Sequence, residues 1–163
     1  MNAYLDIETT GLFPSVHEIT VVGLYLEESG QVTQLVGDSI SSRRLLEALQ
    51  RSTTIYTYNG TRFDLPFLRR RLGVDLETRF VHRDLMFDCW KRNLYGGLKA
   101  VETRLNMPRK TRGIDGLDAV RLWNRYQEYH DHEALRLLLD YNKEDVLNLR
   151  RLKEILSQAH TLP

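Results

Sequence analysis

Leu5-Asp6-Ile7-Glu8-Thr9-Thr10-Gly11-Leu12, at residues 5–12 of a chain of 163, is the stretch that decides how the rest of the sequence is interpreted. Side chains alternate across a strand, so a strand over residues 3–8 places Asp6 and Glu8 together on one face. The first strand of an α/β sheet normally lies inside the sheet, where two neighbouring carboxylates repel each other and lose hydration. A bound cation removes both penalties. The alternative is an edge strand with one face in water, and the pair taken alone favours that alternative.

The elements that follow predict an α/β fold. The face of the first strand opposite the acidic pair carries Ala3, Leu5 and Ile7, which suits a core. The later elements predicted are strands at 18–26, 31–36, 54–58 and 79–84 and helices at about 43–51, 62–72, 85–92, 97–106, 116–129 and 132–158. A turn at Glu28-Ser29-Gly30 joins the first two of these strands into a hairpin. A hairpin followed by strand–helix alternation predicts a mixed sheet, with a hairpin and parallel strands, flanked by helices.

A second acidic residue lies where a strand gives way to a helix. The strand ends at Asn59-Gly60, Thr61 can cap the next helix, and Asp64 falls in its first turn. Ligand sites of open α/β sheets lie outside the carboxyl ends of the strands, so Asp64 is expected at a catalytic position. The alternative is an ordinary helix-start acid, stabilised by the helix dipole and a capping box. For Asp64 alone, that alternative is favoured.

The last helix carries an acidic residue within its apolar stripe. The stripe consists of Leu135, Leu138, Leu149, Leu152 and Leu156. Tyr141 and Asp145 fill the gap in it, and their four-residue spacing puts them on one helix face. Asp145 is therefore expected to face the core, where a carboxylate is costly unless it is paired or bound to metal. A buried salt bridge to an arginine is the alternative explanation.

Composition excludes several classes of protein. The apolar share of 42% and the charged share of 28% are those of an ordinary globular protein, read here as one domain over residues 1–163. The longest apolar run, Ile19–Leu26, is too short to cross a bilayer, so no membrane partner is expected. The first residues lack a signal sequence, and Cys89 is the only cysteine, so the expected location is cytoplasmic. The net charge of +1 does not by itself indicate a nucleic-acid binder.

The three acidic motifs, in this order and spacing, resemble those of the DEDD exonuclease superfamily, the DnaQ-like branch of the RNase H-like fold. They look most similar to the proofreading exonuclease domain of family B DNA polymerases and to YprB-type predicted ribonuclease H-like domains. The family divides by its last motif. One branch has His five residues before the final Asp, where this chain has Asp140, and the other has Tyr four residues before it, which Tyr141 matches. The resemblance, over about residues 3–150, thus points to the tyrosine (DEDDy) branch.

The resemblance implies a 3′–5′ exonuclease that acts on single-stranded ends of DNA or RNA. The residues that would hold two Mg²⁺ or Mn²⁺ ions are Asp6, Glu8, Asp64 and Asp145. Hard cations prefer carboxylate oxygen, and two ions roughly 3.5–4 Å apart promote in-line phosphoryl displacement. Tyr141 would orient the attacking water, and with an ordinary pKa of about 10 it should stay neutral.

Seven further residues are candidates for substrate contacts: Thr9, Leu12, Asn59, Phe63, Arg109, Lys110 and Arg112. Family members contact the terminal nucleotide at the positions of Thr9 and Leu12, through backbone and an apolar wedge. Phe63 stacks on a base or packs in the core, and Asn59 faces a phosphate or makes the turn. The loop with Arg109, Lys110 and Arg112 suits a flexible phosphate contact, although such charge runs are usually solvated faces.

Other polar residues are assigned structural roles, and other functions stay open. Asp84 and Asp88 are expected to cap a helix or form salt bridges, and His130-Asp131-His132 to separate two helices and cap the second. One alternative function is an RNase H-like endonuclease with the same metals. Another is a catalytically silent nucleic-acid-binding module, against which the presence of all four carboxylates and the tyrosine argues. A structural subunit would leave a core-facing Asp145 unexplained.

Overall fold

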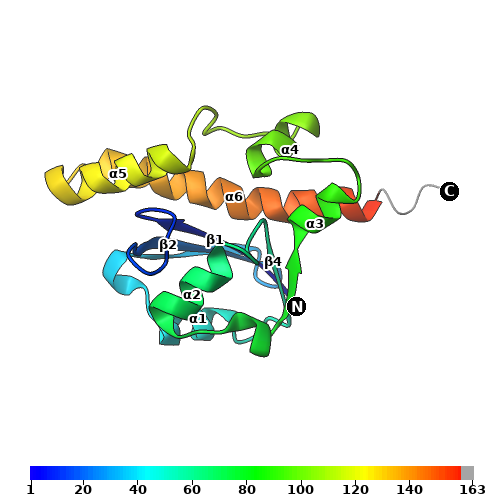
Figure 1. The fold of residues 1–163 in the computed structure, drawn as a ribbon, viewed down its shortest axis with the longest axis horizontal. Coiled ribbons are helices and arrows are strands. Elements are labelled where there is room, and N and C mark those ends of the chain that lie inside the picture. The colour runs from blue at the N-terminus through cyan, green and yellow to red at the C-terminus, as the bar shows by residue number, and fades with distance from the viewer. Residues whose placement is uncertain (159–163) are drawn as a thin grey trace.

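The strand that carries the acidic pair lies in the middle of the sheet. The computed structural model describes residues 1–158 and contains a five-stranded sheet of order β3-β2-β1-β4-β5 (Figure 1). Its strands are β1 (Asn2–Thr9), β2 (Ile19–Leu26), β3 (Gln31–Val36), β4 (Thr54–Thr57) and β5 (Val81–Asp84). β1, β2 and β3 pair antiparallel, whereas β4 runs parallel to both β1 and β5. The predicted mixed sheet is therefore confirmed, and the edge-strand alternative for β1 is wrong.

Helices cover both faces of this sheet. They are α1 (Ser42–Leu49), α2 (Asp64–Leu72), α3 (Leu85–Trp90), α4 (Leu98–Arg104), α5 (Gly116–Tyr129) and α6 (His132–Gln158), with short 3-10 helices η1 (Gly37–Ser39) and η2 (Leu76–Thr78). α1 and α2 lie on one face, and α6 crosses the other, with α3, α4 and α5 alongside it (Figure 1). No helix within residues 1–158 is both long enough and apolar enough to span a membrane.

Alternation along β1 divides the apolar residues into two cores. Ala3, Leu5 and Ile7 are buried among residues of α1 and α2, as the sequence predicts. Tyr4, which points the other way, is buried among residues of α3, α4 and α6. Asp6 and Glu8 share the face of Tyr4, so the alternation directs both carboxylates toward α6. The fold thus brings the acidic strand and the last helix together.

A glycine on β2 allows α6 to pack directly on the sheet. A Cβ atom at Gly23 would lie 2.1 Å from Oδ1 of Asn142, so only glycine fits under that side chain. Asn142 is fully buried and accepts a hydrogen bond from Nε2 of Gln34 at 2.9 Å. Its Nδ2 donates to the carbonyl oxygen of Asp6 at 3.2 Å and to Oδ2 of Asp6 at 2.9 Å. This contact fixes the position of α6 about one turn before Asp145.

Element boundaries differ from the prediction by about two residues, for local reasons. The helix expected from 62 begins at Asp64, because Asn59 adopts a positive φ of 59° and residues 60–63 complete a turn. Asp84 caps α3, with Oδ1 accepting the N–H of Met86 at 3.1 Å, which confirms its predicted capping role. Oδ1 and Oδ2 of Asp84 also accept the N–H groups of Asn59 and Thr61, at 2.8 and 3.1 Å. Asp84 therefore ties the loop before α2 to the end of β5.

Candidate active site

Three carboxylates meet between β1 and α6. Asp6 and Glu8 of β1 and Asp145 of α6 each offer an oxygen, and these oxygens lie within 4.8 Å of one another. Glu8 is 7% exposed and Asp145 is 3% exposed, whereas Asp6 is half-buried, so two of the three carboxylates have little contact with solvent. Within residues 1–158 it is the one cluster of three or more His, Cys, Asp or Glu side chains with this spacing. A set of carboxylate oxygens alone is the donor chemistry that hard divalent cations prefer.

Asp64 lies beside this group but outside it. It is the first residue of α2, and so lies in the first turn as the sequence predicts, and it is 4% exposed. Its Oδ1 accepts the backbone N–H of Ile7 at 3.0 Å, so the carboxylate reaches back to β1 between Asp6 and Glu8 along the chain. The structure therefore brings three of the four predicted carboxylates into one cluster and places the fourth against the same strand.

Burial and mutual repulsion disfavour the ionised form of each carboxyl group in this site. The pKa values of Asp6 and Glu8 are raised well above their ordinary values, first by burial and then by the charge of Asp145. Burial also raises the pKa of Asp64 to about 7, against the lowering effect of its hydrogen bond from Ile7. Burial raises the pKa of Asp145 as well, with Lys99 and Arg109 opposing the shift. A divalent cation would relieve this repulsion, so the residues fit a metal.

The raised pKa of Asp64 predicts the pH dependence of stability in chelator. A carboxyl group whose pKa rises on folding opposes folding increasingly from about pH 4, its unfolded value, to about pH 7. Asp64→Asn lacks this penalty and can still accept the Ile7 hydrogen bond. Its advantage in unfolding free energy over the wild type should therefore grow between about pH 4 and about pH 7 and then stay constant.

Urea unfolding of both proteins across this pH range measures that difference. Asp75→Asn is the control, because the hydrogen bond from Arg69 lowers the pKa of Asp75, so that carboxylate is charged in the folded and the unfolded protein above about pH 5. Its difference in unfolding free energy from the wild type should stay nearly constant up to about pH 7 and shrink only as the pH falls below about 4. A pH-independent difference for Asp64→Asn would mean that its carboxylate is not desolvated in the folded protein.

Two cations reach Asp145 from the segment between α3 and α5. Nζ of Lys99 lies 3.2 Å from Oδ2 of Asp145, and Nη2 of Arg109 contacts Oδ1. The arginine salt bridge, kept as the alternative explanation for a core-facing Asp145, is thus present together with the acidic cluster. The Arg109 side chain is only 4% exposed, because Glu102 accepts hydrogen bonds from two of its nitrogens. Arg109 does not extend into solvent as a flexible phosphate contact would.

Lys110 and Arg112 stay exposed on a loop that is fixed at its base. Glu144 of α6 accepts the N–H of Lys110 at 2.6 Å and that of Thr111 at 2.8 Å, and it also contacts the Thr111 hydroxyl. These bonds clamp the loop to the helix one residue before Asp145. The loop expected to be flexible is therefore anchored, with two of its three cations facing outward.

The remaining predicted contacts lie at the end of β1, in the loop after it and at the start of α2. Thr9 is buried and its hydroxyl donates to the carbonyl of Gly11 at 2.6 Å, while Leu12, in the loop after β1, is 72% exposed. Phe63 packs on the core next to Phe67, with ring centroids 4.9 Å apart. Asn59 makes the turn before α2. Phe63 thus packs in the core and Asn59 makes the turn, which are the structural alternatives given for them above.

Tyr141 lies next to the acidic cluster. It is 2% exposed, and Nζ of Lys99 is 4.2 Å from the centre of its ring. Burial, followed by the charges of Asp145 and Glu8, raises the pKa of its hydroxyl above the ordinary value, so the group is neutral. Over the part of the chain that the structure describes, this hydroxyl makes no hydrogen bond to another residue. It remains able to bind a water or a substrate oxygen.

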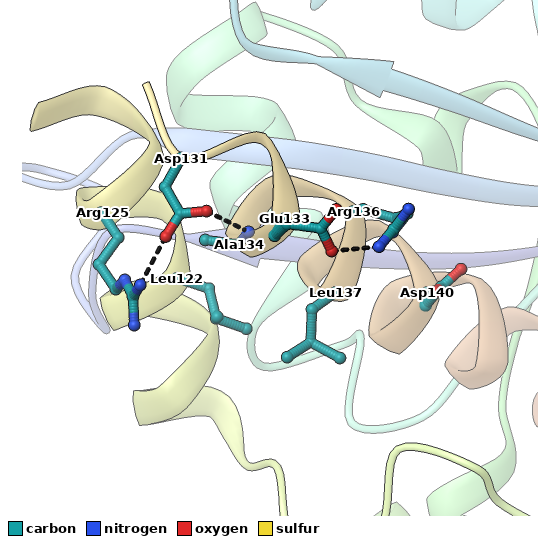
Figure 2. Close-up of a pocket in the computed structure, with 8 residues that line it drawn as sticks. All are labelled: Leu122, Arg125, Asp131, Glu133, Ala134, Arg136, Leu137 and Asp140. Atoms are coloured by element: carbon teal, nitrogen blue, oxygen red, sulfur yellow. Dashed lines mark hydrogen bonds and ion pairs between the residues drawn. The ribbon is translucent and has the colours of Figure 1, made fainter. Parts of the chain in front are cut away.

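A separate pocket lies between α5 and α6, and the charged side chains that line it form ion pairs with each other (Figure 2). Arg125 bonds Asp131 at 2.6 Å, and Arg136 contacts Glu133. Oδ1 of Asp131 accepts the N–H of Ala134 at 3.0 Å, which confirms the predicted cap at the start of α6. This pocket lies where α5 and α6 join, and it shares no residue with the acidic cluster.

Sequence reasoning missed three residues of the site: Lys99, Glu102 and Asn142. Asn142 was detectable in principle, because it lies three residues before Asp145 and so on the same side of the helix. Lys99 and Glu102 share one face of α4, but nothing in the sequence pairs them with their partners on α6, each 46 positions away.

Comparisons with known proteins agree with this architecture. A model of the RNase H superfamily matches residues 3–157. The family B DNA polymerase from the archaeon Pyrobaculum calidifontis superposes with a TM-score of 0.75 at 18% identity, over 95% of this chain and 24% of the polymerase. NrnC from Brucella melitensis with bound Mg²⁺ superposes with a TM-score of 0.67 at 21% identity, over 96% of this chain and 72% of NrnC. NrnC bound to pGG gives a TM-score of 0.65. No curated protein matches in sequence.

Proposed function

Because the chain belongs to the RNase H superfamily, we propose that it is a metal-dependent 3′–5′ exonuclease that hydrolyses phosphodiester bonds at single-stranded nucleic-acid ends. The observation that carries the proposal is the convergence of Asp6, Glu8 and Asp145, whose oxygens lie within 4.8 Å of one another. The similar structures of NrnC with Mg²⁺ and with pGG support a divalent cation and a nucleic-acid substrate for this chain as well.

In the proposed site, Asp6, Glu8, Asp64 and Asp145 hold two Mg²⁺ or Mn²⁺ ions. Two such ions, when bound, supply the Lewis acidity for an in-line phosphoryl displacement. Asn142 keeps Oδ2 of Asp6 in one orientation. The neutral hydroxyl of Tyr141 donates a hydrogen bond that orients the attacking water, which matches the tyrosine branch of the DEDD family.

The substrate is proposed to lie across the anchored loop. A groove of about 700 Å³ runs between this loop and α6, with Lys110, Arg112 and Lys143 among its walls and apolar Leu147 beside them. Exposed cations around an open groove suit a phosphate backbone. Thr9 and Leu12 are proposed to contact the terminal nucleotide. Asn59, Phe63 and Arg109 already have other partners and receive no substrate role.

Replacing Lys110, Arg112 and Lys143 together with Gln should weaken substrate binding and flatten its salt dependence. Each phosphate contact to a single strand contributes about 0.7 to the slope of log K against log salt, so the slope should fall by up to about 2. The turnover number at saturating substrate should change little, because these side chains do not reach the carboxylates. Fluorescence anisotropy with a labelled single strand, in chelator and at several salt concentrations, measures the slope.

A matched control replaces Arg43, Arg44 and Arg51, which are exposed on and next to α1, on the opposite side of the sheet. It removes the same charge and should leave the slope almost unchanged. Equal slopes for the two triple variants would assign the groove cations to an ordinary solvated surface.

End-labelled single-stranded DNA and RNA, incubated with Mg²⁺, Mn²⁺ or chelator, test the proposed function. A 3′–5′ exonuclease releases the label of a 3′-labelled strand at once and shortens a 5′-labelled strand step by step. A circular single strand should resist cleavage, whereas its cleavage would identify the endonuclease alternative. Binding without cleavage under every metal condition would identify a catalytically silent module.

A further inference from the structure

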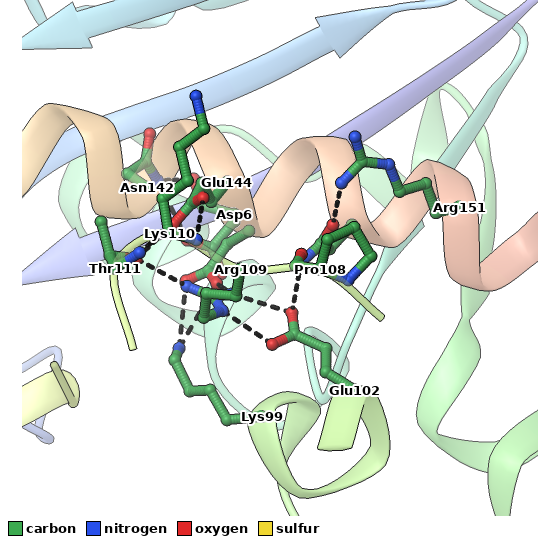
Figure 3. Close-up of polar contacts among 12 residues, drawn as sticks. Asp6, Lys99, Glu102, Pro108, Arg109, Lys110, Thr111, Asn142, Glu144 and Arg151 are labelled. Carbon is green, nitrogen blue, oxygen red and sulfur yellow. Dashed lines mark hydrogen bonds and ion pairs between the residues drawn. The ribbon is translucent and has the colours of Figure 1, made fainter. Parts of the chain in front are cut away.

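A buried row of polar side chains connects α4 to the acidic cluster. Asn148 of α6 donates from Nδ2 to Oε1 of Glu102 at 2.9 Å. Glu102 in turn accepts two hydrogen bonds from Arg109 (Figure 3). Arg109 also contacts Asp145. The Glu102, Arg109 and Asp145 side chains are each 4% exposed. None of the proposed catalytic roles uses Glu102 or Asn148.

The contact between Glu102 and Arg109 fixes the guanidinium in one plane. Nε donates to Oε2 at 2.7 Å, and Nη2 donates to Oε1 at 2.8 Å. Such a two-pronged pair is directional as well as strong, and lysine cannot reproduce it. Nη1 of Arg109 also donates to the hydroxyl of Thr111 at 3.2 Å, on the loop that Glu144 anchors. Arg109 therefore cannot swing away without breaking several buried hydrogen bonds.

This fixed guanidinium determines how Asp145 presents its carboxylate. Nη2 of Arg109 contacts Oδ1, so that oxygen already accepts a charged donor. Among residues 1–158, the donor at Oδ2 is the more exposed Lys99 ammonium, at 3.2 Å, which also lies 3.4 Å from Oδ1. Asp145 can thus offer Oδ2 to a metal ion, while Oδ1 holds its orientation through Arg109.

A count of formal charges shows why the positive charge of Arg109 requires the negative charge of Glu102. Arg109 and Lys99 with two divalent ions carry six positive charges. With both ions bound, the carboxylates of Asp6, Glu8, Asp64, Glu102 and Asp145 would carry five negative charges. One phosphodiester group of the substrate supplies the sixth. Without the charge of Glu102, the site would carry a surplus positive charge, and Arg109 would compete with the metal for Asp145.

We propose that Glu102 is a positioning residue of the metal site. It holds the Arg109 guanidinium against Oδ1 of Asp145, and its charge offsets that of Arg109, so that Oδ2 of Asp145 is available to a divalent cation. The inference rests on the proposed function, because it assumes that Asp145 is a metal ligand. Side chains that hold metal ligands from behind typically change metal affinity about 10–100-fold when they are replaced.

The test measures Mg²⁺ and Mn²⁺ binding by calorimetry, without substrate, for the wild type, Glu102→Gln, Arg109→Gln and the double variant. Glu102→Gln should lower metal affinity about 10–100-fold, and a high metal concentration should restore most of its turnover. In the Arg109→Gln background, adding Glu102→Gln should have little further effect, because Glu102 acts through Arg109. Glu154→Gln, which removes an exposed partner of Arg150 on the same helix, is the matched control and should bind metal like the wild type.

Three outcomes would overturn the inference. Wild-type metal affinity in Glu102→Gln, with lower stability in chelator, would make Glu102 an ordinary structural ion pair. Equal losses with and without Arg109 would show that Glu102 acts independently of it. If Glu102→Gln does not fold, Arg109→Lys provides the test, because it keeps the positive charge but loses the two-pronged contact with Glu102. Unchanged metal affinity in Arg109→Lys would also overturn the inference. A wild type that binds neither metal would instead remove the proposed function itself.

Discussion

Asp6→Asn should abolish metal-dependent phosphodiester hydrolysis and, in chelator, make the folded protein more stable. Asp6 lies in the acidic cluster, and burial with the charges of Asp145 and Glu8 raises its pKa well above the ordinary value. Removing its charge therefore removes a metal ligand and relieves repulsion at the same time. An amide in its place can still accept the 2.9 Å hydrogen bond from Nδ2 of Asn142, so the contact with α6 is retained. A gain of about 0.5–2 kcal/mol is typical when a strained functional site is relieved.

End-labelled cleavage and thermal melts, each with chelator and with Mg²⁺ or Mn²⁺, measure both halves of this expectation. The wild type should gain stability on metal addition, by about 2.7 kcal/mol at 100 times the dissociation constant. Asp6→Asn should gain much less. Glu128→Gln, at an exposed position of α5, is the control and should behave like the wild type. Normal cleavage by Asp6→Asn would refute the assignment of Asp6 as a metal ligand. Lower stability of Asp6→Asn in chelator would show that neighbouring positive charges already compensate the Asp6 carboxylate in the wild type.

Tyr141→Phe should bind metal normally and turn over about 10²–10⁴-fold more slowly, the range typical of side chains that handle protons. The phenylalanine ring keeps the packing of Tyr141 in the core between α5, α6 and β2 and its contact with Lys99. Only the hydroxyl is lost, and with it the hydrogen bond proposed to orient water. Because the pKa of Tyr141 is raised, the wild-type turnover should show no loss from tyrosine ionisation up to about pH 10.

Tyr58→Phe is the matched control for this prediction. Its hydroxyl donates to the carbonyl of Gly96 at 2.7 Å, so that variant loses a structural hydrogen bond without touching the cluster. It should lose some stability and keep its turnover number. Reduced metal affinity in Tyr141→Phe, with an unchanged turnover number at saturating metal, would mean that the hydroxyl contributes to metal binding instead.

The sequence was sufficient for the fold and for the orientation of the acidic residues. The alternation of Ala3, Leu5 and Ile7 with the acidic pair predicts two faces of one strand, and each face has its expected environment. The gap in the apolar stripe of the last helix predicts that Asp145 faces inward, and it is 3% exposed. Both predictions depend only on the periods of strand and helix, which are local properties of the chain.

Contacts between distant residues could not be predicted in the same way. A charge run in a loop is normally solvated, so the pattern around Arg109 gave no sign that its first member turns inward to Glu102 and Asp145 while the next two face outward. Phe63 illustrates the same limit, because an aromatic side chain at a helix start suits a base or a core equally well. Only the path of the chain after β4 decides that it packs with Phe67.

The clamp that Glu144 places on the loop after α4 has a consequence for the thermodynamics of binding. Fixing the backbone of one flexible residue costs about 1–2 kcal/mol of conformational entropy. The backbone at Lys110 and Thr111 is already held by hydrogen bonds of 2.6 and 2.8 Å, so that entropy is lost during folding rather than on contact with a ligand. A strand that enters the groove therefore meets a pre-organised surface. Its association should show a small heat-capacity change and little of the entropic penalty that accompanies loop ordering.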